Sequence, residues 1–130
     1  MSDRPIFRVG VAGLDPRDAR LIEILFRHGR RNPHDFRLLD LLDMTAIDIL
    51  IANASEPEGL DAMAAAREFH RRIPVVVAVP RGAQTAARHS VTIDRLTLQL
   101  LPILNRVVQD EGLLEAADPG PTLCNELTEL

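Results

Sequence analysis

The chain has 130 residues, of which 46% are hydrophobic and 26% are charged, and its formal net charge at pH 7 is −4. This length and apolar share suit one compact domain, whereas the negative charge argues against a nucleic-acid or anionic-membrane surface, which needs clustered Lys and Arg. The sequence shows neither a long apolar span nor a signal-peptide pattern, so we expect a cytoplasmic protein. The single cysteine, Cys124, excludes an internal disulfide and a cysteine-rich metal site.

The chain opens with a predicted strand that is followed by a predicted helix. Phe7 to Gly13 reads FRVGVAG, a short apolar run. Asp15 can cap a helix that begins beside Pro16, and Asp18 places an acid where it complements the helix dipole. Gly29 suits the carboxyl-terminal cap of that helix. We therefore expect a strand and a helix joined by a tight loop.

The middle of the chain predicts central strands of a parallel sheet. Ile47 to Asn53 and Ile73 to Pro80 are apolar on both faces, as in strands that helices cover on both sides. A weaker strand pattern occupies Phe36 to Leu42. Between the two apolar runs, Ser55 and Glu58 have capping-box spacing ahead of strong helix formers. This alternation predicts a doubly wound α/β sandwich.

The pattern after the second apolar run fits two assignments. In the first, Arg81 to His89 forms a turn and a short helix, and Ser90 to Asp94 forms a short strand. Arg95 to Gly112 is then the last helix, which contains Pro102. In the second, Leu96 to Leu101 is the fifth strand and the helix begins at the proline. We favour the first assignment.

The distribution of charge distinguishes the carboxyl-terminal segment and two basic clusters. We expect residues 1–110 to form the domain and residues 111–130 to form an acidic, flexible tail. Basic clusters at Arg27 to Arg37 and Arg67 to Arg72 fall where helices should end, and cations there complement the helix dipole. The alternative is a docking patch for an acidic partner.

The order and spacing of these elements resemble the receiver domain of two-component response regulators, over Phe7 to Val108. In that family the third strand begins with an aspartate, reaches the phosphoacceptor aspartate, and is followed by a proline. Asp48, Asn53 and Pro57 hold that pattern, with intervals of five and four residues. The resemblance implies a flavodoxin-like three-layer sandwich with a five-stranded parallel sheet.

The residues at the strand ends depart from the chemistry of that family. Phosphotransfer to a receiver needs a carboxylate nucleophile and neighbouring carboxylates that hold a divalent cation. Asn53 offers a neutral amide, which forms no acyl phosphate. Gly13 and Leu14 replace the family's acidic pair, or Ala12 and Gly13 do so on a one-residue shift. Asp15 lies nearby, and we interpret it as a helix cap; a substitute acceptor is the alternative.

Two further positions of the family's site are also replaced. Val79 stands where the family carries a hydroxyl residue, and Arg95 stands where it carries a lysine, or Leu101 on the second assignment of the last strand. The degenerate phosphorylation site therefore consists of Gly13, Leu14, Asp15, Asn53, Val79 and Arg95. The four histidines lack metal-ligand spacing and are interpreted as surface residues. We expect no enzymatic activity, no catalytic residue, no cofactor and no metal.

The resemblance implies a phosphorylation-independent pseudo-receiver that acts through protein contact in bacterial-type signal transduction. The partner is expected to be a signalling protein or a second copy of the chain, with no nucleic acid and no membrane. In the family the partner face lies around the fourth helix, fifth strand and fifth helix. The exposed candidates there are Arg81, Arg88, His89, Arg95, Gln99 and Arg106.

A function of a different class is also open. Replacement of the acids by Gly and Leu frees space and removes negative charge at the strand ends. A small-ligand sensor could then use the vacated crevice near Gly13, Asn53, Ala54 and Arg81.

Overall fold

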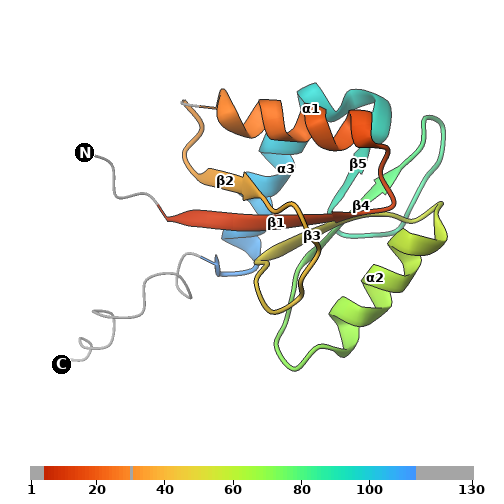
Figure 1. Cartoon of the computed structure of the whole chain (residues 1–130). Coiled ribbons are helices and arrows are strands. Elements are labelled where there is room, and N and C mark those ends of the chain that lie inside the picture. The colour runs from red at the N-terminus through yellow and green to blue at the C-terminus, as the bar shows by residue number, and fades with distance from the viewer. Residues whose placement is uncertain (1–4, 30, 114–130) are drawn as a thin grey trace.

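The structure is a computed structural model that describes residues 5–29 and 31–113. Within these residues, five parallel strands form one sheet in the order β2-β1-β3-β4-β5 (Figure 1). This is the doubly wound, flavodoxin-like α/β sandwich expected from the sequence. The strands are β1 (Ile6–Ala12), β2 (Asp35–Leu38), β3 (Ile49–Asn53), β4 (Val75–Val79) and β5 (Ser90–Thr92). The helices are α1 (Pro16–Arg27), α2 (Pro57–Glu68), the short 3₁₀ helix η1 (Ile93–Arg95) and α3 (Leu96–Asp110).

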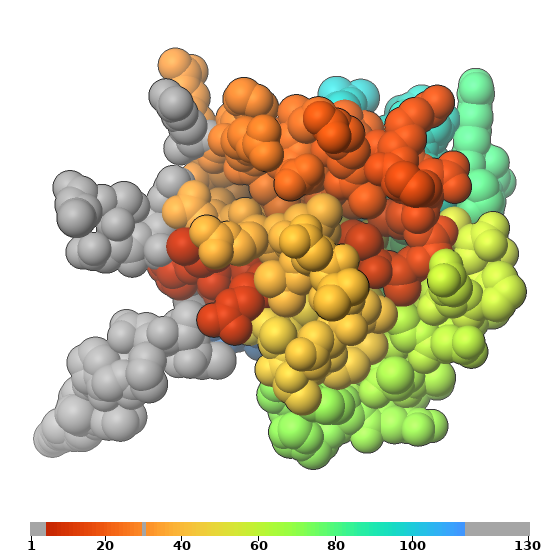
Figure 2. Space-filling model, viewed as in Figure 1, coloured from red at the N-terminus to blue at the C-terminus, as the bar shows by residue number. Residues whose placement is uncertain are grey.

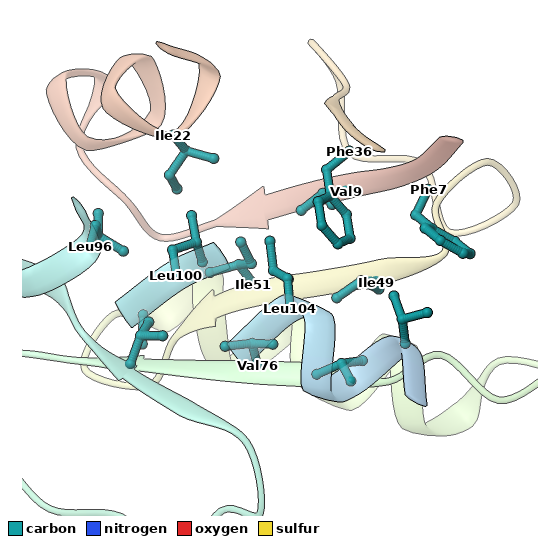
Figure 3. Packing of buried hydrophobic residues seen from close by; sticks show 14 residues of the cluster. Phe7, Val9, Ile22, Phe36, Ile49, Ile51, Val76, Leu96, Leu100 and Leu104 are labelled. Carbon is teal, nitrogen blue, oxygen red and sulfur yellow. The ribbon is translucent and has the colours of Figure 1, made fainter. Parts of the chain in front are cut away.

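One face of the sheet packs against α1 and α3. Alternate residues of the central strands point to this side, among them Val9 of β1 and Ile51 of β3. Ile22 of α1 and Leu100 and Leu104 of α3 are fully buried against them (Figure 3). The helix α3 runs through Pro102, which is exposed, so the proline sits on the solvent side of the helix. This face holds most of the large buried side chains.

The opposite face of the sheet packs against α2. Leu50 and Ala52 of β3 point to this side, and Ala62 and Ala66 of α2 cover them. The helix approaches so closely that a Cβ built on Gly59 would overlap the carbonyl oxygen of Asn53. Small residues on α2 therefore bring the helix against the end of β3.

The first assignment of the carboxyl-terminal elements is confirmed, because β5 spans Ser90–Thr92 and one helix spans Leu96–Asp110. The short helix expected over Arg81 to His89 is absent, so that prediction is wrong. Gly82 takes a positive φ of 82° in a turn, and the hydroxyl of Thr85 accepts the amide N–H of Ala87 at 3.1 Å. Local side-chain hydrogen bonding of this kind competes with helix formation.

Asp15 is the N-cap residue of α1 and Pro16 opens the helix, as expected, but the expected capping hydrogen bonds are not formed. Glu56, not Ser55, is the N-cap of α2, and neither it nor Asp15 makes a side-chain cap hydrogen bond. The helix α1 ends before Gly29, with His28 at the cap. The second strand is also shorter than the expected Phe36 to Leu42. Most of the segment expected to be a tail, residues 114–130, lies outside the described residues.

Candidate functional site

The carboxyl ends of β1 and β3 meet at the point where the sheet changes its winding direction. The chain leaves β1 through α1 toward β2, whereas it leaves β3 through α2 toward β4, so α1 and α2 lie on opposite faces (Figure 1). A crevice at such a switch point is the usual binding position in open α/β sheets. Gly13 and Asn53 stand at this point.

The side chain of Asn53 closes this point of the sheet with two hydrogen bonds. Its Nδ2 donates to the carbonyl oxygen of Gly13 at 3.0 Å, and its Oδ1 accepts the amide N–H of Ser55 at 2.9 Å. The residue is 8% exposed. An amide can donate and accept at once, whereas an ionised carboxylate can only accept. Asn53 is therefore matched to its neighbours as an amide.

The hydrogen bond to Ser55 also explains why α2 begins later than the sequence predicts. Asn53 forms a local turn in which its side chain takes the Ser55 amide, a common role of Asn at the end of an element. The backbone carbonyl of Asn53 accepts the amide of Glu56 at 3.2 Å, and Pro57 then opens the helix. One side chain thus links β1, β3 and the start of α2.

Asp15 lies apart from the hydrogen bonds of Asn53 and does not form an acidic pair there. It is exposed at the N-cap of α1, and its backbone carbonyl accepts the amide of Ala19 at 3.0 Å. Its side chain lines a cavity between α1 and η1, together with Asp94. Gly13 and Leu14 line a different cavity, on the side of α2. The described residues contain no group of three or more His, Cys, Asp or Glu side chains placed to hold a metal ion.

The remaining positions of the degenerate site differ in burial. Val79 ends β4 and is 7% exposed, so it contributes an apolar wall at the carboxyl edge. Arg95 is exposed at the N-cap of α3. Arg81 is also exposed, and its Nε lies 3.8 Å from Oδ2 of Asp94. Ala54 donates its amide to the carbonyl of Ala78 at 3.2 Å, which ties the end of β3 to β4.

A cavity of about 530 Å³ lies beside Gly13 and Leu14, at the end of β1. The end of β1, the segment 39–48 and α2 surround it, and the space-filling view is hollowed where these segments meet (Figure 2). Leu42 and Met44 give it apolar walls, and Glu58 and Asp61 place carboxylates at its rim. The cavity could accept a small molecule without displacing Asn53.

The expected partner face is only partly exposed. Arg88, Arg95 and Arg106 are exposed, whereas Gln99 is half-buried and its Oε1 accepts the amide of Thr92 at 2.8 Å. His89 was expected at the surface and is 4% exposed, because its ring packs inside the domain with Nε2 at 3.4 Å from Oε2 of Glu111. The surface interpretation of the histidines is therefore wrong for His89, and it is also wrong for His34, which is buried.

Sequence reasoning also missed the role of Glu111. Its side chain is 7% exposed, and its Oε1 accepts a hydrogen bond from Nε of Arg72 at 2.8 Å. The hydrogen bond from Arg72 lowers the pKa of this carboxyl, against the opposing effect of burial. Glu111 lies within the segment expected to be a tail, where a single glutamate among acids gave no signal of burial.

Comparison with family models, with curated proteins and with solved structures finds no match. The structure has no helix, among the residues it describes, that is long and apolar enough to cross a membrane. Functional interpretation therefore depends on the fold and the contacts of the chain's own residues.

Proposed function

We propose that the chain is a phosphorylation-independent pseudo-receiver, a regulatory module that acts by binding a protein of a signalling system. The observation that carries this proposal is the position and bonding of Asn53. It ends β3 at the switch point of a receiver-like sheet, yet its amide is used for a hydrogen bond to Gly13 that a carboxylate could not make. The fold supports a receiver origin, and the amide argues against acyl phosphate chemistry.

The partner surface that we propose lies on β5 and α3. Leu98 is 72% exposed on α3, and among the described residues only Leu41 is a more exposed large hydrophobic side chain. Together with Gln99, Pro102 and Arg106 it borders a shallow cavity that reaches β5, the edge strand of the sheet. An apolar centre with an arginine at its rim is the composition of a protein interface. Arg95 and Arg106 add positive charge, which suits an acidic partner.

Capture from the native cells tests this surface directly. The wild-type chain is compared with a variant that carries Leu98→Ser, Arg95→Glu and Arg106→Glu. A matched control carries Arg37→Glu on β2 and Arg67→Glu on α2, which are exposed, at the sheet edge opposite β5 and on the sheet face opposite α3. A protein captured by the wild type and the control, and lost by the first variant, supports the proposal. A specific partner held equally by all three contradicts the proposed surface.

The cavity beside Gly13 favours a second candidate function, a small-ligand sensor. It lies next to the vacated phosphorylation crevice and is lined by Gly13 and Leu14, the residues that replace the acidic pair. A thermal-shift screen of nucleotides and metabolites tests this candidate. A hit should disappear in Ala65→Phe, because Ala65 is exposed on α2 and lines the cavity. A screen without a hit, or a hit that survives the filled cavity, counts against it.

A further inference from the structure

A second cavity lies on the α2 face at the opposite, amino-terminal edge of β4. Its volume is about 500 Å³, within the range of small-molecule sites. The end of α2, the start of β4, the segment before β5 and the residue after α3 surround it. The segment 80–89 crosses from β4 to β5 without a helix, and the sheet face beside α2 is therefore left open there. This cavity is separate from the Asn53 crevice.

The floor of this cavity is apolar and its rim is basic. Ala66, Ile73, Pro74 and Val77 line it and are buried, so they form a firm base. Four guanidinium groups line it as well, and only one carboxylate does. We call these residues the arginine cleft: Arg67, Arg71, Arg72, Arg88, His89 and Glu111. The whole chain has a net charge of −4, but this cavity has an excess of positive charge around an apolar floor. Such a local excess calls for an explanation.

Internal contacts use only part of this positive charge. Glu111 accepts a hydrogen bond from Arg72 at 2.8 Å and lies 3.7 Å from NH1 of Arg88. The side chain of Arg71 donates to the backbone carbonyls of Met44 and Ile47, at 3.0 and 2.7 Å. Arg67 is exposed and makes no ion pair with the residues that the structure describes. One carboxylate therefore faces several cations, and the cleft can accept a further anion.

His89 supplies an independent sign of an incomplete site. It lines the cleft, it is 4% exposed, and its Nδ1 is buried with no hydrogen-bond partner among the described residues. A buried polar atom without a partner is uncommon in folded proteins and requires a reason. Because Nε2 faces the acceptor-only carboxylate of Glu111, Nδ1 is left as an acceptor, and an N–H or O–H group of a ligand at the base of the cleft would give it a partner.

We propose that the arginine cleft binds a small organic anion, with an apolar body on the alanine and valine floor and a carboxylate or phosphate among the arginines. The size of the cavity favours a small molecule over a folded partner. Arginine is suited to both anions because its planar guanidinium binds carboxylate and phosphate through paired hydrogen bonds. This inference is independent of the proposed pseudo-receiver function. Leu98, Arg95 and Arg106, which carry the proposed partner surface, do not line the arginine cleft.

Amide chemical-shift titration of the full chain tests the proposal with defined probes. Phenyl phosphate and benzoate carry the two anionic groups, benzyl alcohol is the neutral control, and inorganic phosphate lacks the apolar body. We expect saturable shifts at residues 66–75 and 87–90 with at least one organic anion, and none with benzyl alcohol. The stronger of the two anions identifies the headgroup. Shifts that do not saturate, that are equal for the neutral control, or that lie elsewhere overturn the proposal.

Two substitutions with opposite expected effects make the test specific. Arg67→Gln removes an exposed cation and should weaken binding by up to about fivefold, as expected for the loss of one solvent-exposed ion pair. Glu111→Gln removes the internal competitor, releases Arg72 and Arg88, and should strengthen binding. Arg20→Gln, on α1, is the control and should leave the affinity unchanged. Binding that is insensitive to both cleft substitutions, or saturation of the cleft by an acidic peptide alone, overturns the proposal.

Discussion

The two faces of the sheet are packed differently. On one face, α1 and α3 contact the strands through large aliphatic side chains. On the other face, α2 contacts the strands through alanines. Leu100, Leu104 and Ile22 fill the first interface, and Ala62 and Ala66 form the second. On the α2 side the segments 39–48 and 80–89 cross the sheet without a helix, and a cavity lies beside each. The face beneath α1 and α3 is therefore packed by larger side chains, whereas the helix-free crossings of the other face leave two cavities beside α2.

The largest expected effect is a loss of packing on the face beneath α3. Leu104→Ala should lower the free energy of unfolding by about 2–5 kcal/mol, because Leu104 is fully buried and its removal leaves a cavity. On the other face, Met63→Ala should lower it by about 1 kcal/mol, because Met63 is only half-buried. Denaturant unfolding of both variants measures the difference. Equal losses would contradict the tighter packing at Leu104 than at Met63.

A smaller loss is expected where α2 touches β3. Gly59→Ala should lower the free energy of unfolding by about 1–3 kcal/mol, because the new Cβ would overlap the backbone of Asn53 and force the helix outward. Leu60→Ala, at the next and exposed position of the same helix, should change it by less than about 0.5 kcal/mol. Denaturant unfolding again gives the values. A neutral Gly59→Ala would mean that α2 is not held tightly against the sheet.

Asn53→Asp tests the hydrogen bonds at the crevice. The carboxylate can still accept the Ser55 amide, but it places an oxygen against the carbonyl of Gly13 in place of a donor. We expect a loss of about 1–3 kcal/mol at neutral pH, since a buried acceptor loses its partner. Thermal and denaturant unfolding against wild type measure it. An unchanged stability would show that the amide is not required there.

The smallest expected effect concerns Glu111 and is pH-dependent. Its pKa is lowered in the folded state, chiefly by the hydrogen bond from Arg72, so its stabilisation is present above the unfolded pKa of 4.5 and is lost as the pH falls through the folded value. Glu111→Gln should cost at most about 1 kcal/mol at neutral pH, because both guanidinium groups are largely in water. The difference between wild type and variant should shrink toward zero in acid. If the stability difference between wild type and variant grew in acid, the Glu111 carboxylate would not be the stabilising form.

Much of the fold could be predicted because the apolar runs have a clear period. The unbroken run that ends at Asn53 and the run that ends at Pro80 predicted central strands, and both β3 and β4 lie there. Arg95 to Gly112 is the last helix of the favoured assignment; Leu96, Leu100 and Leu104 recur there at helical spacing, and all three are buried. The exposed position of Pro102 explains why the helix passes through it.

The features that the sequence did not predict depend on individual side-chain hydrogen bonds and on contacts between distant residues. The Ser55 and Glu58 pair had capping-box spacing, but Asn53 takes the Ser55 amide first. Arg81 to His89 has helix-forming alanines, but a Gly82 turn and the Thr85 side chain prevent a helix. His89 and Glu111 are separated by 22 residues and bury each other only in the folded chain. Charge patterns do not reveal such pairs.

We propose above that this flavodoxin-like chain is a receiver-like module that does not carry out phosphoacceptor chemistry. The most direct measurement is the intact mass of the wild-type chain and of Asn53→Asp after incubation with acetyl phosphate and Mg²⁺. We predict unchanged masses for both, because Gly13 and Leu14 supply no carboxylate for the cation even when the acceptor is restored. A gain of about 80 Da by the wild type, one phosphoryl group, would contradict the claim and would point to Asp15 as the acceptor.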